Sequence, residues 1–156
     1  MKPLPWRTVK LWKCVRCGEC CSLTVQLTMS EWLNLTRMYG FTIADQDISG
    51  FFLRKTLDNK CPFLLNTFSK FRCGLQNTKL MACKIWPFRV LTEPKYGEAD
   101  EALFTYRDKK FYIYVLPTCS GITWGRPTER LSKKVLPELI DIRFGFLQRQ
   151  YFSTSF

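Results

Sequence analysis

The chain has 156 residues, of which 46% are hydrophobic and 15% aromatic, so it can bury a core and is too apolar for a disordered polypeptide. Its longest apolar stretch, residues 111–116, is far shorter than the roughly 20 residues that span a bilayer, and residues 1–10 contain no apolar segment of signal-peptide length, so we expect a cytoplasmic protein. The net charge is +11 and histidine is absent, which excludes histidine-dependent catalysis and every zinc site that requires imidazole.

The first half of the chain predicts one helix and several short strands. Thr28 and Glu31 form a capping-box pattern, which predicts a helix with Trp32, Leu35 and Tyr39 on one face, ending at Gly40. Residues 51–53 are typical of a strand. Residues 61–65 and 70–74 are typical of two strands joined by a turn at 66–67, and a helical turn is expected over residues 75–83.

The second half predicts a hairpin followed by helix. Residues 102–106 and 111–116 flank a polar turn. The apolar stripe at Leu131, Val135, Leu139, Ile142 and Phe146 has helical spacing and is expected to pack on the core. Pro137 interrupts this stripe, which predicts a kink or two consecutive helices.

These elements predict a small α+β domain, in which cysteine loops surround a short antiparallel sheet and a C-terminal helical segment packs against it. We expect residues 1–125 to form the cysteine-bearing domain and residues 126–156 a basic helical extension.

The cysteines carry most of the functional information. Cys14, Cys17 and Cys20 are spaced three apart, which is the local arrangement of three ligands to a cubane iron–sulfur cluster. We expect these three to share one centre, with Cys83 or Cys119 as the fourth ligand. Cys21, Cys61 and Cys73 are then expected to form or support a second centre.

Three other interpretations compete with an iron–sulfur cluster. Free cysteines can be small buried hydrophobic residues, but this hardly explains four within residues 14–21. Disulfides are disfavoured because Cys20 and Cys21 are adjacent and a cytosol is reducing. Zinc held by four thiolates stays open, because spacing alone does not identify the metal.

The eight cysteines also resemble those of the CxxCxxCC family, described as a zinc- or iron-chelating domain. The resemblance covers about residues 14–125 and rests on Cys14-x-x-Cys17-x-x-Cys20-Cys21, Cys61-Pro62-Phe63-Leu64, Cys73 with Cys83, and Cys119-Ser120-Gly121. It implies that all eight cysteines are metal ligands. The chain departs from the family at Lys79-Leu80, where members commonly carry Arg-Pro. A flagellin lysine N-methylase is a relative similar in carrying an iron–sulfur cluster, which leaves cluster-dependent methyl transfer as a further function.

Two other functions are favoured over cluster-dependent methyl transfer. The first is a redox or iron-handling module with an iron–sulfur cofactor, most simply 4Fe-4S, working with a protein redox partner. The second is a basic protein associated with RNA or the ribosome, in which the metal is structural and cations contact phosphates. An autonomous enzyme is less favoured, because the sequence has no phosphate loop and no dinucleotide fingerprint. The residues predicted to bind RNA or another acidic partner are Arg7, Lys10, Arg126, Arg130, Lys133, Lys134, Arg143 and Arg149.

Overall fold

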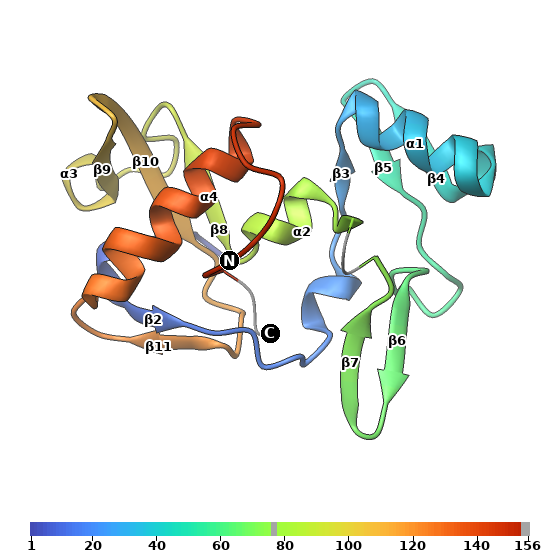
Figure 1. Cartoon of the computed structure of the whole chain (residues 1–156), viewed down its shortest axis with the longest axis horizontal. Helices are drawn as coiled ribbons and strands as arrows, with labels where there is room; N and C mark the ends of the chain where they lie inside the picture. Colours follow the sequence, from blue (N-terminus) through green and yellow to red (C-terminus); the bar gives the residue numbers. More distant parts are fainter. Residues whose placement is uncertain (76–77, 154–156) are drawn as a thin grey trace. The chain divides into compact units, whose positions relative to one another are not determined.

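The computed structural model describes residues 1–75 and 78–153, and these form two compact units. The first, here called the terminal unit, contains residues 1–15 and the chain from residue 84 onward. The second, the inserted unit, is Arg16–Cys83. Both contain helices and antiparallel strands, which confirms the α+β class (Figure 1). The boundary expected after residue 125 stays a prediction; residues on both sides of it lie in the terminal unit.

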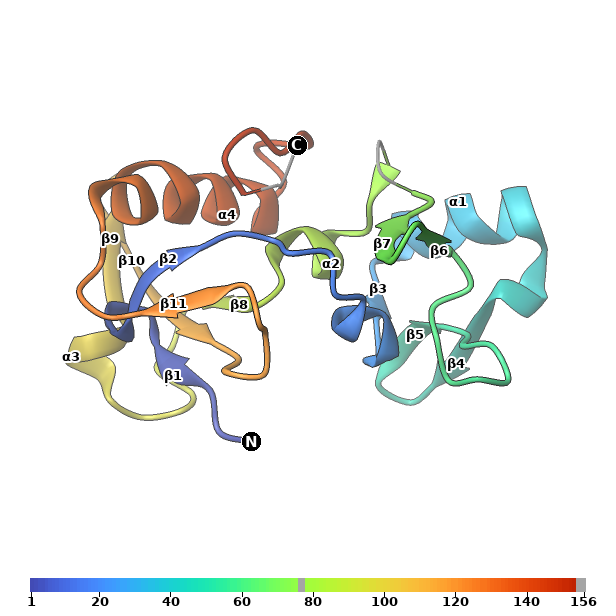
Figure 2. The same ribbon diagram turned by 90° about the horizontal axis from the view of Figure 1, so that it is seen from below.

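The terminal unit is built on a four-stranded antiparallel sheet. Its central strand, β10 (Lys109–Val115), pairs with β1 (Leu4–Pro5), β8 (Phe88–Leu91) and β9 (Leu103–Tyr106). A separate two-stranded ribbon pairs β2 (Val9–Trp12) with β11 (Ile122–Trp124), and the two strands run side by side in Figure 2. The short helices η1 (Trp6–Thr8) and α3 (Ala99–Ala102) complete this part of the unit.

The predicted hairpin is confirmed as β9 and β10. Its turn consists of Arg107 and Asp108, which have φ of 49° and 60°. A two-residue turn in which both residues have a left-handed backbone matches the right-handed twist of the paired strands. Because the turn takes up only these two residues, β10 begins at Lys109, two residues before the predicted start at residue 111.

Two consecutive helices follow, as Pro137 predicted. A π-helical segment, η5 (Leu131–Val135), leads directly into α4 (Leu136–Arg143). Proline has no N–H to donate within a helix, and a π-turn accommodates the missing bond. The packing of the stripe is also confirmed at four positions, because Leu131, Val135, Leu139 and Ile142 are buried in the unit.

The prediction that the fifth residue of the stripe packs on the core is wrong. Phe146 is 72% exposed, because α4 ends at Arg143 and Gly145, with φ of 81°, turns the chain away.

The inserted unit begins with the short helix η2 (Glu19–Ser22) and contains a three-stranded antiparallel sheet. The strand order is β3 (Gln26–Leu27), β5 (Gly50–Leu53) and β4 (Ala44–Asp47), and η3 (Phe41–Ile43) precedes β4. The predicted strand at 51–53 is therefore confirmed. The helix α1 (Met29–Tyr39) starts at the predicted capping box, with both reciprocal hydrogen bonds formed, and its C-cap is Gly40.

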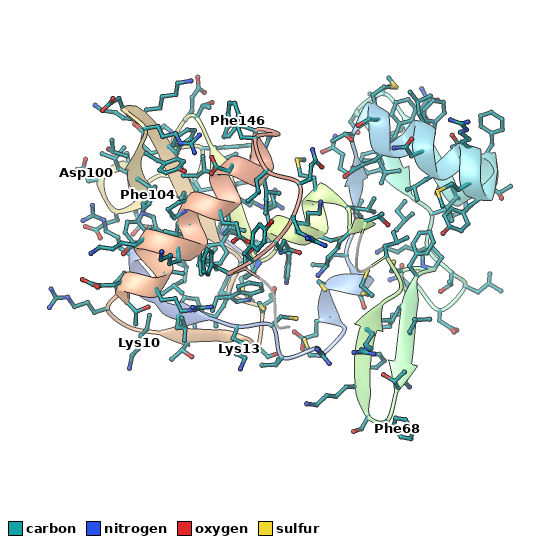
Figure 3. All side chains as sticks on the ribbon, viewed as in Figure 1. Lys10, Lys13, Phe68, Asp100, Phe104 and Phe146 are labelled. Carbon is teal, nitrogen blue, oxygen red and sulfur yellow. The ribbon has the colours of Figure 1, made fainter. Side chains whose placement is uncertain are left out.

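A second hairpin in this unit pairs β6 (Leu64–Thr67) with β7 (Lys70–Cys73). The predicted turn at 66–67 is displaced to Phe68 and Ser69, which have φ of 45° and 67°. The first strand starts at Leu64, three residues later than predicted. Figure 3 shows Phe68 at the tip of the hairpin, where it is fully exposed.

The helical turn expected over 75–83 appears as α2 (Met81–Ile85), and residues 76–77 of the predicted range lie outside the described residues. Within residues 1–75 and 78–153, no helix combines the length and the apolar character that crossing a membrane requires.

Candidate metal centre

The loop before η2 is shaped by its contact with β7. Gly18 has φ of 76°, and a Cβ atom there would lie 2.8 Å from the Phe71 ring. The Phe71 N–H donates a hydrogen bond to the carbonyl oxygen of Arg16 at 3.2 Å, and the Cys21 N–H donates to the Gly18 carbonyl at 3.1 Å. Glycine is needed here because it allows both the left-handed backbone and the close approach of the aromatic ring. The loop thereby fixes η2, with Cys20 and Cys21, beside β7.

Main-chain hydrogen bonds bring Cys61 and Cys73 to the same place. The Cys61 N–H donates to the carbonyl oxygen of Cys21 at 2.7 Å. Cys73, the last residue of β7, is paired with Leu64 at the start of β6, and the next residue, Gly74, donates to the Phe63 carbonyl at 2.7 Å. Two cysteines distant in sequence from η2 are therefore positioned by backbone contacts.

Glu31 positions the segment that carries Cys83. One of its carboxylate oxygens accepts a hydrogen bond from the Thr28 N–H at 2.9 Å, and the other accepts from the Met81 N–H at 2.7 Å. Met81 is the first residue of α2, which includes Cys83. The capping-box pattern in the sequence predicted the hydrogen bond from Thr28. Nothing in the sequence predicted the hydrogen bond from Met81, which lies 50 residues away.

The thiols of Cys20, Cys21 and Cys61 interact directly. The Cys21 thiol interacts with each of these neighbours, and its single proton can be donated to either of them. This hydrogen bond, assisted by the charge of nearby Lys79, lowers the pKa of the Cys20 thiol to about 6. The same donor lowers the pKa of Cys61 to about 7. The pKa of Cys21 itself is raised, because its interactions with the thiols of Cys20 and Cys61, together with burial, favour the protonated form.

The other two thiols of the network, those of Cys73 and Cys83, have raised rather than lowered pKa values. Burial raises the pKa of Cys73, and burial together with the negative charge of Cys20 raises the pKa of Cys83 to about 12. Lys79 acts in the opposite direction on both, so its ammonium group is a positive charge shared by Cys20, Cys73 and Cys83. The sequence identified Lys79 only as a departure from the family pattern and gave no sign of this role.

The chemistry of these five thiols fits a thiophilic metal. Thiolate sulfur suits zinc and iron–sulfur clusters. Cys61, Cys73 and Cys83 also pack against the apolar cluster of the inserted unit, together with Trp32 and Phe63. The side chains do not, however, form a finished coordination shell: within residues 1–75 and 78–153, no three or more Cys, Asp or Glu side chains are arranged to hold one ion. Metal binding would therefore require these side chains to rearrange.

The other three cysteines lie elsewhere in the chain. Cys17 is in the inserted unit and is exposed. Cys14 and Cys119 belong to the terminal unit, where both are half-buried against its core. The Lys13 N–H donates to the Gly121 carbonyl at 3.0 Å, which joins the segments that carry these two cysteines. The grouping of Cys14, Cys17 and Cys20 around one centre with Cys83 or Cys119 as the fourth ligand stays a prediction. The assignment of Cys21, Cys61 and Cys73 to a second centre or its support stays a prediction too.

The basic residues predicted to meet RNA or another acidic partner all lie in the terminal unit. Arg143 is half-buried, and the other seven are exposed: Arg7, Lys10, Arg126, Arg130, Lys133, Lys134 and Arg149. Their contact with a partner stays a prediction.

Comparison with known families agrees with the cysteine pattern. Residues 13–120 match the family model CxxCxxCC, which is described as "Putative zinc- or iron-chelating domain". No curated protein and no solved structure matches the chain.

Proposed function

The chain belongs to the CxxCxxCC family of zinc- or iron-chelating domains, and on this premise we propose that it is an iron–sulfur protein with a redox or iron-handling role. The observation that carries the proposal is that four separate segments of the inserted unit contribute cysteines to one thiol network. These segments are η2 with Cys20 and Cys21, the residue Cys61, the end of β7 with Cys73, and the start of α2 with Cys83.

The low pKa values of Cys20 and Cys61 support ligation. Metal ligands must be deprotonated. At neutral pH the Cys20 thiol, with a pKa of about 6, is mostly thiolate, and the Cys61 thiol, with a pKa of about 7, is about half thiolate. Lys79 offsets part of the negative charge that several thiolates would bring together. A bound cluster would supply one-electron transfer, at a potential that depends on burial and on hydrogen bonds to sulfur.

The choice of iron–sulfur over zinc rests on the spacing of the first cysteines. The network has five thiols, enough for the four cysteine ligands that an iron–sulfur cluster and a tetrahedral zinc site both require, so the number of thiols supports metal binding without identifying the metal. The spacing of Cys14, Cys17 and Cys20, by contrast, is that of ligands to cubane clusters. A structural zinc site remains the second candidate, because the same donor atoms suit it.

Anaerobic purification followed by metal and acid-labile sulfide analysis tests the proposal. We expect brown protein that contains iron and sulfide and shows a visible absorption band that bleaches with dithionite. Colourless protein with zinc and no sulfide would establish the structural zinc site instead.

Cysteine variants locate the centre. Cys61→Ser and Cys73→Ser should lose most of the metal. Cys119→Ser, the matched change in the terminal unit, retains the metal if the centre is confined to the inserted unit and loses it if Cys119 is the fourth ligand. If both inserted-unit variants retain the metal and Cys119→Ser loses it, the metal centre does not lie in the inserted unit.

A further inference from the structure

The C-terminal segment of the terminal unit is fixed to the helix α4 by one buried carboxylate. Glu138 accepts hydrogen bonds from the N–H groups of Tyr151 at 2.9 Å, Phe152 at 2.7 Å and Ser153 at 3.2 Å. It also accepts one from the Ser153 hydroxyl at 2.6 Å. A buried charge with four donors is well satisfied. The backbone of residues 151–153 is therefore held in place, although the segment lies beyond the last helix.

This anchoring presents two aromatic rings to solvent. Tyr151 is 60% exposed and Phe152 is 38% exposed. Burial of a terminal segment for core stability alone would place these rings inside the unit. Aromatic rings that are held in position at the surface can instead stack on a planar ligand with little loss of conformational entropy.

Cations lie directly beside one of these rings. The Arg130 guanidinium is 5.8 Å and the Lys134 ammonium 5.4 Å from the centre of the Phe152 ring. Neither has a carboxylate partner in the part of the chain that the structure describes, whereas the neighbouring Lys133 is paired with Glu129 at 3.2 Å. Arg130 and Lys134 are thus positive charges available to an external anion.

The β2–β11 ribbon, which carries further cations, is joined by hydrogen bonds to the segment that leads into the helix. The Lys10 carbonyl accepts hydrogen bonds from the Thr128 N–H at 3.0 Å and from the Thr128 hydroxyl at 2.9 Å. These bonds join Lys10 to the segment that contains Arg126 and leads into η5. Figure 3 shows Lys10 on this ribbon with its side chain directed away from the unit. On β11, Trp124 adds a third partly exposed ring.

From these contacts we propose that this surface, formed by Lys10, Trp124, Arg126, Arg130, Lys134 and the rings of Tyr151 and Phe152, binds single-stranded nucleic acid. Unpaired cations contact phosphates, and exposed rings stack on unpaired bases, so the two kinds of group together match a single strand. The carboxylates of an acidic protein would pair with the cations but would offer no aromatic planes on which the exposed rings could stack. A duplex would offer phosphates but no accessible base faces. The proposal is independent of which metal the inserted unit holds.

Fluorescence anisotropy with the full-length chain tests this surface. The probes are labelled oligouridylate and oligothymidylate of about 12 nucleotides, within the usual site size of a single-strand binding groove, titrated at salt concentrations from about 50 to 200 mM. We expect binding that weakens with salt. The double variant Arg130→Ala/Lys134→Ala should weaken it by about tenfold or more and reduce the slope of log K against log salt by about 1.4, because each lost phosphate contact contributes about 0.7 for single strands.

Two further variants separate stacking from charge. Tyr151→Leu and Phe152→Leu keep an apolar side chain and the net charge, and each should weaken binding about fivefold or more without changing the salt slope. The matched control is Lys109→Ala/Lys110→Ala, which removes the same charge from the exposed start of β10 and should leave binding unchanged. Thermal melts followed by circular dichroism confirm folding, and Tyr151→Leu keeps the stacking test valid if the Phe152 variant unfolds.

Three results would overturn the proposal. The first is an absence of single-strand binding at the lowest salt concentration. The second is equal weakening by the Lys109/Lys110 control, which would reveal a diffuse basic surface. The third is stronger binding to polyglutamate or to a duplex of the same length than to the single strands, which would assign the cations to an acidic protein or to duplex phosphates.

Discussion

The carboxylate of Glu31 accepts a hydrogen bond from the Met81 N–H at 2.7 Å, and so joins the first turn of α1 to the first turn of α2. The two residues are 50 positions apart in the sequence. Because α2 contains Cys83, a residue that caps one helix also orients a thiol of the candidate metal centre.

Replacement of Glu31 by alanine should therefore affect both stability and metal. Loss of the capping box and of a charged acceptor should cost about 1–3 kcal/mol in the free energy of unfolding. Loss of the group that orients a metal ligand should weaken metal binding about 10- to 100-fold. Urea denaturation and competition with a chelator measure the two effects. Glu93→Ala, an exposed acid of the terminal unit, should change neither.

Gly18 offers a test of the loop that positions η2. In Gly18→Ala, the new residue must adopt a left-handed backbone, and its Cβ atom also meets the Phe71 ring at 2.8 Å. Gly97→Ala is the matched control, because Gly97 has φ of 81° but nothing within 4 Å of its Cβ position. We expect the control to lose about 1 kcal/mol of stability. The Gly18 variant should lose more, together with metal content; equal losses would show that the contact with Phe71 is unimportant.

The thiol network predicts unequal reactivity toward alkylating reagents in metal-free protein. Slightly above neutral pH, Cys20 and Cys61 should react fastest, because their pKa values are about 6 and 7, and Cys83 should react slowest, with a pKa of about 12. Peptide mass spectrometry after timed treatment with iodoacetamide measures the rates. Cys21→Ala removes the shared donor and should slow Cys20 and Cys61 severalfold. Similar rates at all sites in the folded protein, as in denatured protein, would contradict the network.

The same pKa values set how metal-free protein responds to pH. The lowered pKa of Cys20 makes a stabilising contribution that is complete above its ordinary value of 9.0 and is lost as the pH falls through about 6. The raised pKa of Cys83 acts in the opposite sense, stabilising below 9.0 and losing this effect as the pH rises toward about 12. Urea midpoints measured for Cys20→Ser and Cys83→Ser across this range should show opposite pH dependences relative to the unchanged protein.

The sequence was most informative where one local interaction determines the structure. Thr28, Glu31 and Gly40 predicted the start and end of α1, because caps act within a single turn. The apolar stripe predicted helical packing on the core, and Pro137 predicted a kink or two consecutive helices, of which the structure has the second. The prediction for Phe146 failed because α4 has already ended at that point, and the turn after β6 was misplaced because Phe68 is not a usual left-handed former.

The candidate site could be predicted only in part. The cysteines were evident as candidate metal ligands, but which of them interact depends on contacts between distant segments, such as Cys61 with Cys21. The bond from Glu31 to Met81 and the shared charge of Lys79 likewise arise only from tertiary structure. None of these has a periodic or spacing signal, because each joins residues whose separation is set by the fold.

Glu138 provides a final test, of whether the C-terminal segment acts apart from the metal. Glu138→Ala leaves the four donors from Tyr151, Phe152 and Ser153 without their acceptor, so we expect a loss of about 2–4 kcal/mol in stability. Trypsin should then cut faster after Arg149, because the segment is no longer held to α4. Metal content should be unchanged, since the thiol network lies in the inserted unit.

The matched control for this change is Glu129→Ala, which removes only the exposed pair with Lys133 and should alter neither the rate of cleavage nor the stability measurably. Because both variants remove one carboxylate from the same end of the chain, a difference between them reports the buried hydrogen bonds of Glu138 rather than the change in net charge. Loss of metal from Glu138→Ala at temperatures where the protein is still folded would instead show that the terminal unit supports the metal centre.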